Sequence, residues 1–271
     1  MRQLREARAR RGVWPGSDRC ALSISFDDAR DSQPRALLPL LDRLGVRATF
    51  FVLPDPVERD PGPWREVVAA GHEIGNHTAT HPCSANNPWS RHRGLEQLTL
   101  ADFTRELDEA EQRIEATLGV TPRVFAYPCG NTFVGRGRAT RSLVPLVAER
   151  FVAGRTFNDT VANAPRHCDL AQVAAVAVDC IDIHQLRPQL EATIADRAWL
   201  VVGGHEVGPN LAPETTKLAT LEAAVEWCRE HRVWVDTVGA VAARVAQLAG
   251  RAADDDGDGD GQDALVRKRL A

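Results

Sequence analysis

The stretch CALSISFDDARDSQPRALLPLLDRLGVRATFFVL, residues 20–53, decides the fold class of this 271-residue chain. Two short apolar runs, 20–26 and 48–53, predict strands, and between them residues 34–44 repeat apolar positions at the spacing of a helix. A strand, a helix and a second strand in this order form the unit from which parallel sheets and (β/α) barrels are built. The stretch therefore predicts an α/β fold.

The same alternation of strands and helices continues through most of the chain. After a polar loop that ends near residue 98, Thr99 is suited to cap a helix over 99–119. Further strands are expected at 72–76, 123–128, 151–155, 173–178, 199–204 and 232–236. The remaining helices are expected at 63–71, 140–149, 187–197, 214–230 and 238–250. This pattern predicts a single α/β domain with a parallel sheet or barrel.

Three parts of the chain differ in composition. Residues 1–19 form a basic N-terminal arm, 20–250 form the α/β domain, and 251–271 form an acidic tail rich in aspartate and glycine. In the tail, Asp256, Asp258, Asp260 and Gly261 follow the spacing of a calcium-binding loop, but Arg267 stands where the bidentate carboxylate belongs. We therefore expect a disordered, solubilising tail rather than a calcium site.

Composition and charge argue against several classes of protein. Charged residues make up 26% and apolar residues 44% of the chain, and no apolar run approaches the ~20 residues of a membrane span. The basic start lacks the apolar segment of a secretory signal, and a net charge of −4 gives no argument for nucleic acid. The six cysteines include no CxxC pair and are too sparse for a disulfide scaffold. These features predict a cytoplasmic protein, kept in a reducing compartment, that binds neither membranes nor nucleic acid.

Polar residues directly after strands are the candidates for a functional site. In parallel α/β folds, the loops at the carboxyl ends of the strands converge on one face. Four such places stand out: Asp27 with Asp28, His77 with His81, the turn YPCGN at 127–131, and His205. We expect these residues to meet.

Asp27 and Asp28 follow the first predicted strand. Adjacent carboxylates at a strand end point in opposite directions, so one can bind a metal ion while the other accepts a proton. A pair of aspartates is also common as the cap before a helix, and this alternative stays open.

His77 and His81 lie four residues apart in GHEIGNHTATHP, residues 71–82. A helical turn places both imidazoles on one side, whereas a straight strand would hold them ~13 Å apart, too far for one ion. Two imidazoles and a carboxylate form the ligand set of one catalytic divalent ion, with zinc as the first choice. The motif is not HExxH, so the base must come from elsewhere, and Asp27 is available. Cys83 is either a further ligand or a buried, unreactive thiol.

Four motifs in this order resemble a known family. They are SISFDD at 23–28, HTATH at 77–81, FAYPCG at 125–130 and the strand that ends before His205. Together they are similar to the motifs of the polysaccharide deacetylase family (NodB-homology domain, carbohydrate esterase family 4), over roughly residues 20–240. The resemblance implies a single-domain, distorted (β/α) barrel of about seven strands. It also implies a metal-dependent hydrolase that removes an acetyl group from an N-acetylated or O-acetylated sugar or glycan.

The resemblance assigns roles to individual residues. Asp28, His77 and His81 would bind the metal ion, Asp27 would be the general base, and His205 would be the general acid that protonates the departing amine. The backbone N–H of Cys129 would help to stabilise the oxyanion. Asp182, in VDCID at 178–182, would orient His205.

Two positions depart from the family's pattern. Ala126 stands where the family has an arginine that braces the base, so Arg123 or Arg155 would take that role. The neighbours of Asp28 and His205, in DDAR and GGHE, also differ from the family and leave the substrate open.

Two segments near the motifs offer further contacts. In the insertion 83–98, Trp89 either stacks on a sugar ring or is a packing residue. The arginines of NTFVGRGR, Arg136 and Arg138, either contact an anionic substrate or are solvated loop charges.

The leading hypothesis is a metal-dependent deacetylase acting on a carbohydrate or a small N-acylated substrate. A second hypothesis is a hydrolase of another non-peptide C–N bond, such as a cyclic amide or a formyl amide, on the same ion. A third is a non-catalytic carbohydrate-binding relative, and Asp27 beside Asp28 argues against it because binding needs no base. The sequence leaves the oligomeric state open.

Overall fold

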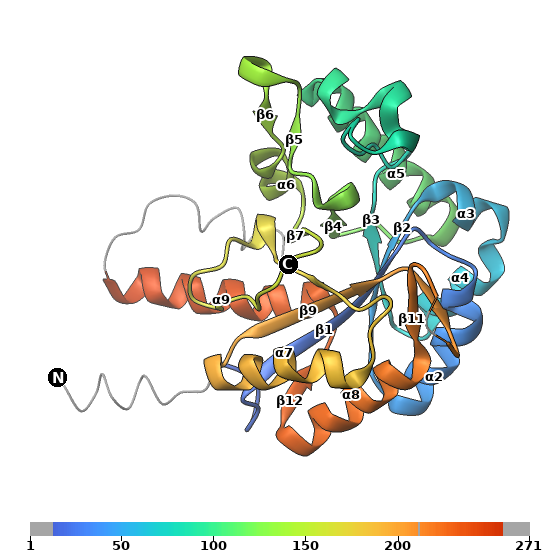
Figure 1. Cartoon of the computed structure of the whole chain (residues 1–271). Coiled ribbons are helices and arrows are strands. Elements are labelled where there is room, and N and C mark those ends of the chain that lie inside the picture. Colours follow the sequence, from blue (N-terminus) through green and yellow to red (C-terminus); the bar gives the residue numbers. More distant parts are fainter. Residues whose placement is uncertain (1–12, 211, 257–271) are drawn as a thin grey trace.

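A single parallel sheet organises the structure. The computed structural model describes residues 13–210 and 212–256 (Figure 1). Eight strands run parallel, seven of them in the order β7-β4-β3-β2-β1-β9-β8, while β12 also pairs with β1. The sheet curls into part of a barrel, which confirms the predicted single-domain α/β fold. The strands are β1 (Cys20–Asp27), β2 (Thr49–Val52), β3 (Glu73–Asn76), β4 (Val124–Ala126), β7 (Ala153–Arg155), β8 (Val176–Ala177), β9 (Trp199–Gly204) and β12 (Val233–Val235).

β1 is the centre of the sheet. Its residues 21–26 pair with β9 along one side. On the other side, residues 20–22 pair with β12 and residues 25–27 pair with β2. The strand is buried from end to end, as expected for a strand that lies inside a parallel sheet.

Helices cover both faces of the sheet. Alternate residues of β1 divide between the two faces: Leu22 and Ile24 join a core cluster with α2, α7 and α8, whereas Ala21 joins a second cluster with α9. The helices are α2 (Leu38–Leu44), α3 (Pro54–Arg59), α4 (Pro61–Ala69), α5 (Leu100–Leu118), α6 (Val144–Arg150), α7 (Ile183–Asp196), α8 (Leu218–His231) and α9 (Val238–Asp256). The predicted helices are thus present, and α3 is an addition that the sequence pattern did not indicate.

The cap of α5 shows how local chemistry fixes an element. The Thr99 hydroxyl accepts a hydrogen bond from the Asp102 N–H, and the Asp102 carboxylate accepts one from the Thr99 N–H at 2.8 Å. This reciprocal capping box satisfies N–H groups that lack partners in the first turn. The helix ends at Gly119, whose φ of 72° is left-handed. The predicted start at Thr99 is confirmed.

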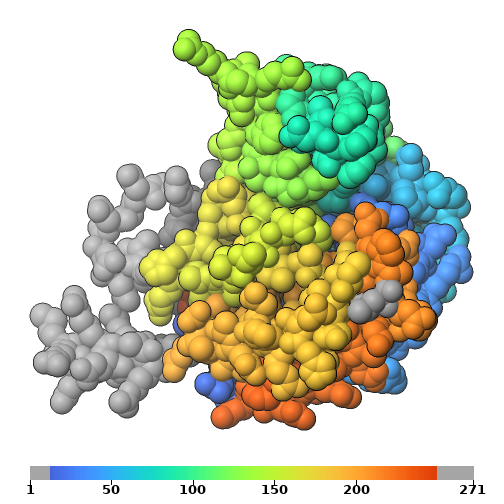
Figure 2. Space-filling view, in the orientation of Figure 1, coloured from blue at the N-terminus to red at the C-terminus, as the bar shows by residue number. Residues whose placement is uncertain are grey.

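Two small sheets were not predicted. β10 (Glu206–Gly208) pairs with β11 (Thr215–Lys217), and β5 (Phe133–Val134) pairs with β6 (Arg141–Ser142). The β5–β6 hairpin projects from the surface beside the segment near residue 95 (Figure 2), where the Gly135 N–H donates to the Leu95 carbonyl at 2.9 Å.

The ends of the domain differ in detail from the expectation. Trp14 lies in the predicted N-terminal arm, yet it is buried, and its indole N–H donates to the Arg197 carbonyl at 3.0 Å. α9 continues to Asp256 instead of ending near Gly250. The rest of the predicted calcium spacing, Asp258, Asp260, Gly261 and Arg267, lies outside the described residues. Among the described residues, no helix is both long and apolar enough to span a bilayer.

Candidate active site

The two aspartates after β1 point to different partners. Asp27 is the last residue of β1 and is buried. Asp28 follows with a φ of 71°, so the chain turns and the second carboxylate faces another direction. The next helical segment begins at Gln33 with Ser32 at its cap position, so the alternative role of the pair as a helix cap is wrong.

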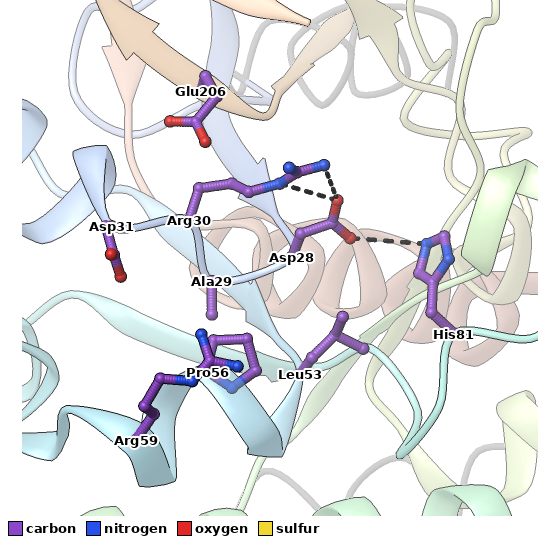
Figure 3. Close-up of a pocket in the computed structure, with 9 residues that line it drawn as sticks. All are labelled: Asp28, Ala29, Arg30, Asp31, Leu53, Pro56, Arg59, His81 and Glu206. Carbon is purple, nitrogen blue, oxygen red and sulfur yellow. Dashed lines mark hydrogen bonds and ion pairs between the residues drawn. The ribbon is translucent and has the colours of Figure 1, made fainter.

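A tight turn after β3 brings the two histidines together. Thr78 N–H donates to the Asn76 side chain at 2.8 Å, and His81 N–H donates to the Thr78 hydroxyl at 3.0 Å. The imidazole ring centroids of His77 and His81 are 4.8 Å apart. The Nε2 atoms of both rings lie 3.6 Å from Oδ1 of Asp28. The structure therefore brings together the three predicted ligands (Figure 3 shows Asp28 and His81).

These three residues fit a divalent ion. Oδ1 of Asp28 is buried and has no hydrogen-bond partner among the described residues. Nδ1 of His77 lies 2.9 Å from the Ala126 carbonyl oxygen, which can only accept, so Nδ1 carries the hydrogen and Nε2 offers its lone pair. The ligand atoms of Asp28, His77 and His81 all lie within 4.8 Å of one another. Two neutral imidazoles and one carboxylate are a ligand set for zinc or a related ion.

The charges of the site favour its metal-binding protonation state. Burial alone would raise the pKa of Asp28, but its basic neighbours His77, His81, His205 and Arg30 outweigh burial and lower it. Burial, followed by the neighbouring imidazole of His77, lowers the pKa of His81 to about 4. Both groups are thus in the forms that can bind a cation at neutral pH.

Asp27 is held by a buried arginine. Oδ1 of Asp27 accepts a hydrogen bond from Nη2 of Arg155, which is fully buried at the end of β7. The guanidinium of Arg155 also lies over two aromatic rings, 4.8 Å from the centroid of Phe51 and 5.3 Å from that of Phe157. Arg155 therefore fills the place left by Ala126, and the other candidate, Arg123, is exposed.

Gln33 links the ends of two strands beneath the site. Its side-chain N–H groups donate to the Asp27 carbonyl at 2.6 Å and to the His205 carbonyl at 2.9 Å. This buried amide fixes the distance between the end of β1 and the end of β9, and the sequence motifs gave no sign of it.

His205 is oriented by Asp179, and the prediction of Asp182 is wrong. Nδ1 of His205 lies 2.6 Å from the Asp179 carboxylate, which also accepts from the Thr216 hydroxyl at 2.6 Å. Asp182 instead caps α7, where it accepts from the backbone N–H groups of His184 and Gln185. The predicted stretch 178–182 was right, but the aspartate that contacts the histidine is three residues earlier.

The Asp179 contact also sets the charge of His205. Burial alone would lower the pKa of His205, but the hydrogen bond to Asp179 and the charges of Asp27 and Asp28 raise it above its ordinary value. The protonated form of His205 is therefore stabilised.

Cys129 and Cys83 form a disulfide, with their Cα atoms 5.9 Å apart. This corrects the expectation for Cys83, which is neither a free metal ligand nor a free, unreactive thiol. Cys129 has a φ of 53°, and among the described residues its backbone N–H donates to no protein acceptor. The N–H is thus available for an oxyanion.

Two pockets adjoin the site, and His81 lines both. One, of about 430 Å³, is lined by Asp28, Arg30 and Arg59 among others (Figure 3). The other, of about 280 Å³, includes Trp89, His92 and Arg93. Trp89 is 65% exposed, so it is not a packing residue. Arg136 and Arg138 line neither pocket.

Comparison with known proteins identifies a family that this chain resembles. Residues 16–143 match the family model for polysaccharide deacetylase. A chitooligosaccharide deacetylase of Rhizobium leguminosarum bv. trifolii is 43% identical over 112 residues, which are 40% of this chain and 45% of that protein. The uncharacterized protein YlxY of Bacillus subtilis is 34% identical over 95 residues, which are 35% of this chain and 26% of that protein. The chain thus spans less than half the length of either curated relative.

The likeness extends to a solved structure. The crystal structure of a polysaccharide deacetylase homologue from Mycobacterium smegmatis superposes with a TM-score of 0.65 at 20% identity, covering 87% of this chain and 93% of that one. This similarity shows a shared fold. The resemblance first indicated by the sequence motifs is therefore confirmed: residues 16–143 of this chain match the polysaccharide deacetylase family.

Proposed function

We propose that the protein is a metal-dependent hydrolase that removes an acetyl group from an N-acetylated or O-acetylated sugar or glycan. One observation carries the proposal: the unpartnered, buried Oδ1 of Asp28 faces two imidazole Nε2 atoms, directly beside an aspartate that an arginine holds in place. The chitooligosaccharide deacetylase among the relatives supports the choice of substrate class.

Asp28, His77 and His81 would hold one divalent ion, most simply zinc. Such an ion, when bound, polarises an acyl carbonyl and lowers the pKa of a bound water toward ~7. Asp27 would take the proton from the attacking water. Because Arg155 donates a hydrogen bond to Oδ1 of Asp27, the proton would go to Oδ2.

Two further groups would complete the reaction. The Cys129 N–H would donate to the oxygen of the acetyl group as negative charge develops there, a contribution on the order of 3 kcal/mol for one fixed donor. His205, kept protonated by Asp179, would give its proton to the leaving amine, which departs poorly without it. A hydrolase needs both a base and an acid beside the ligand set, whereas a binding protein needs neither.

The disulfide bears on where this reaction would take place. Disulfides persist mainly in oxidising compartments, so Cys83–Cys129 favours such a compartment over the predicted cytoplasm. Trapping free thiols with an alkylating reagent at cell lysis would test this, because alkylation of Cys83 and Cys129 in the native cell would restore the cytoplasmic prediction.

Acetate release and metal content test the proposed reaction. We expect the wild-type protein to contain about one divalent ion and to release acetate from N-acetylated sugar oligomers. Asp27→Asn should keep the ion and lose activity by roughly 10²-fold or more, because the proton acceptor is gone. His77→Ala should lose the ion. Asp42→Asn, at an exposed surface position, is the matched control and should behave like the wild type.

Three outcomes would contradict the proposal. Full activity in Asp27→Asn would show that Asp27 is not the general base. Normal metal content in His77→Ala would show that His77 is not a metal ligand. Activity on cyclic or formyl amides with none on acetylated sugars would replace the deacetylase by a hydrolase of another C–N bond.

A further inference from the structure

The Cys83–Cys129 disulfide joins two separate parts of the site. Cys83 comes two residues after the ligand His81, and Cys129 lies in the turn after β4 that carries the available N–H. The bond spans a sequence separation of 46 residues. Cys83 is fully buried and Cys129 is half-buried, so the bond lies at the edge of the site and not on the outer surface.

The bond lies directly against the second side of a metal ligand. Sγ of Cys83 is 3.6 Å from Nδ1 of His81, whose Nε2 faces Asp28. The sulfur of Cys129 also belongs to this cluster, since the ligand atoms of His81, Cys83 and Cys129 lie within 4.8 Å of one another. Groups that pack against the outer nitrogen of a ligating histidine fix the orientation of its ring.

Both connected segments have backbone conformations that need support. His81 has a φ of 54° and Cys129 a φ of 53°, and a left-handed conformation is unfavourable for a residue with a Cβ atom. Such conformations persist where surrounding structure holds them. The disulfide restrains both segments at once. The hydrogen bond from the Ser84 N–H to the Asn131 side chain, at 3.0 Å, is a second link between the same two segments.

We propose that the Cys83–Cys129 disulfide is a positioning element for the deacetylation: it keeps the His81 ring and the Cys129 N–H in fixed relation to each other. This inference rests on the proposed function. We expect the chain to stay folded when the bond is broken, because neither cysteine belongs to any of the three hydrophobic core clusters, while a ligand and an oxyanion donor would be loosened together. The loss should therefore appear in kcat and in metal affinity more than in KM.

The first experiment measures kcat and KM for acetate release. Wild-type protein is compared before and after treatment with dithiothreitol, in which the S–S bond breaks, two thiols form and the reductant becomes a cyclic disulfide. After anaerobic removal of the reductant, we expect kcat to fall at least about tenfold with KM changed less than about threefold, since small misplacements of reacting groups cost this much or more. Reoxidation should restore kcat.

Two variants serve as matched controls. Cys83→Ala/Cys129→Ala should show the lowered kcat and should not respond to dithiothreitol. Cys168→Ser, at a free cysteine outside the site, should respond like the wild type. Circular dichroism at the assay temperature should show all of them folded.

The second experiment does not depend on activity. The metal-free forms of the wild type and of Cys83→Ala/Cys129→Ala are titrated with Zn²⁺ in competition with a chromophoric chelator. We expect the double variant to bind Zn²⁺ about tenfold more weakly or worse, as when a group that supports a ligating histidine is removed.

The outcomes separate this inference from the proposed function. Absence of acetate release from the oxidised wild type would count against the proposed function, and the zinc titration would then decide the positioning role alone. A folded double variant with wild-type kcat and wild-type zinc affinity would overturn the inference. So would a change confined to thermal stability, which would show a purely structural bond.

Discussion

At the scale of single residues, the site depends on pairs in which one side chain fixes another. Arg155 holds Asp27, Asp179 holds His205, and the Ala126 carbonyl sets which nitrogen of His77 carries the hydrogen. None of these partners is adjacent in sequence to the residue that it orients. Each of the three side chains is thus held in one orientation by a partner from another part of the chain.

The pH dependence of activity should reveal the Asp179–His205 pair. The proposed acid works when protonated, and its raised pKa keeps it protonated to higher pH, so activity should fall as pH rises through that pKa. Asp179→Asn removes the negative charge beside His205 and replaces the charged acceptor by a neutral amide, so the pKa of His205 should fall. We expect the alkaline limb of the kcat/KM profile to move to lower pH, together with a lower kcat.

Asp182→Asn is the matched control for this prediction. Asp182 caps α7 and does not contact His205, so the alkaline limb should stay in place. The free energy of unfolding should fall by less than about 1 kcal/mol, because asparagine also caps helices well. If both variants moved the alkaline limb equally, the assignment of Asp179 would be wrong.

The structure brings together the predicted residues that lie at strand ends. His77 and His81 were chosen by their type and spacing and Asp28 by the resemblance, and the topology places the three side by side. Asp182 failed for a reason that the sequence does contain: Gln185 three residues later completes a capping box, which indicates a helix start. Asp179 reaches His205 only because β8 and β9 are neighbours, and that pairing is not visible in the motif.

At the scale of elements, β3 places the histidine turn between β2 and β4. Gly75 lies where a Cβ atom would come within 2.4 Å of the Phe51 ring and 3.1 Å of Val124. The strand can approach its neighbours this closely because the residue has no side chain. The close approach sets where Asn76 ends the strand and where His77 begins the turn.

Gly75→Ala should therefore destabilise the fold and displace the turn. We expect a loss of roughly 1–3 kcal/mol in the free energy of unfolding, measured by urea denaturation, because an added methyl overpacks a filled core. Gly62→Ala is the control: its added Cβ would have only one atom within reach, at 4.0 Å in the side chain of Asp60, and alanine favours the helix that contains it. Equal stability of the two variants would contradict the close packing at Gly75.

Elements with a clear period were predictable, and short or tightly paired ones were not. β1, β2 and α5 have strong patterns, and a cap in the case of α5, and appear where expected. α3 has only six residues, two of them proline, and so shows no apolar period. The disulfide could not be found from spacing, because 46 residues separate its cysteines and only the fold brings them together.

At the scale of the whole molecule, two pockets share His81 as a lining residue. The pocket with Arg30 and Arg59 begins at the end of β1 and reaches α3, whereas the pocket with Trp89 belongs to the insertion 83–98. A substrate that fills both pockets would pass His81. An exposed tryptophan offers a flat apolar surface to a sugar ring.

Trp89→Ala should thus affect long substrates more than short ones. We expect KM for an N-acetylated sugar oligomer to rise by roughly tenfold, in line with the loss of one aromatic stacking contact of about 0.5–1.5 kcal/mol plus its buried area. For a monosaccharide substrate the change should be small. Steady-state kinetics with a series of oligomer lengths checks this. An equal change in KM at every length would contradict stacking of a distant sugar ring on Trp89. Val161→Ala, at another exposed apolar side chain, is the control.

The threefold pairing of β1 has a consequence for the order in which the molecule opens. With β9 along one side and both β12 and β2 along the other, its amides can exchange with deuterated water only when several ladders separate at once. The strand that carries the two carboxylates is thereby among the last segments to be exposed. Thermal fluctuations that open the outer strands of the sheet would leave β1, and Asp27 at its end, in place.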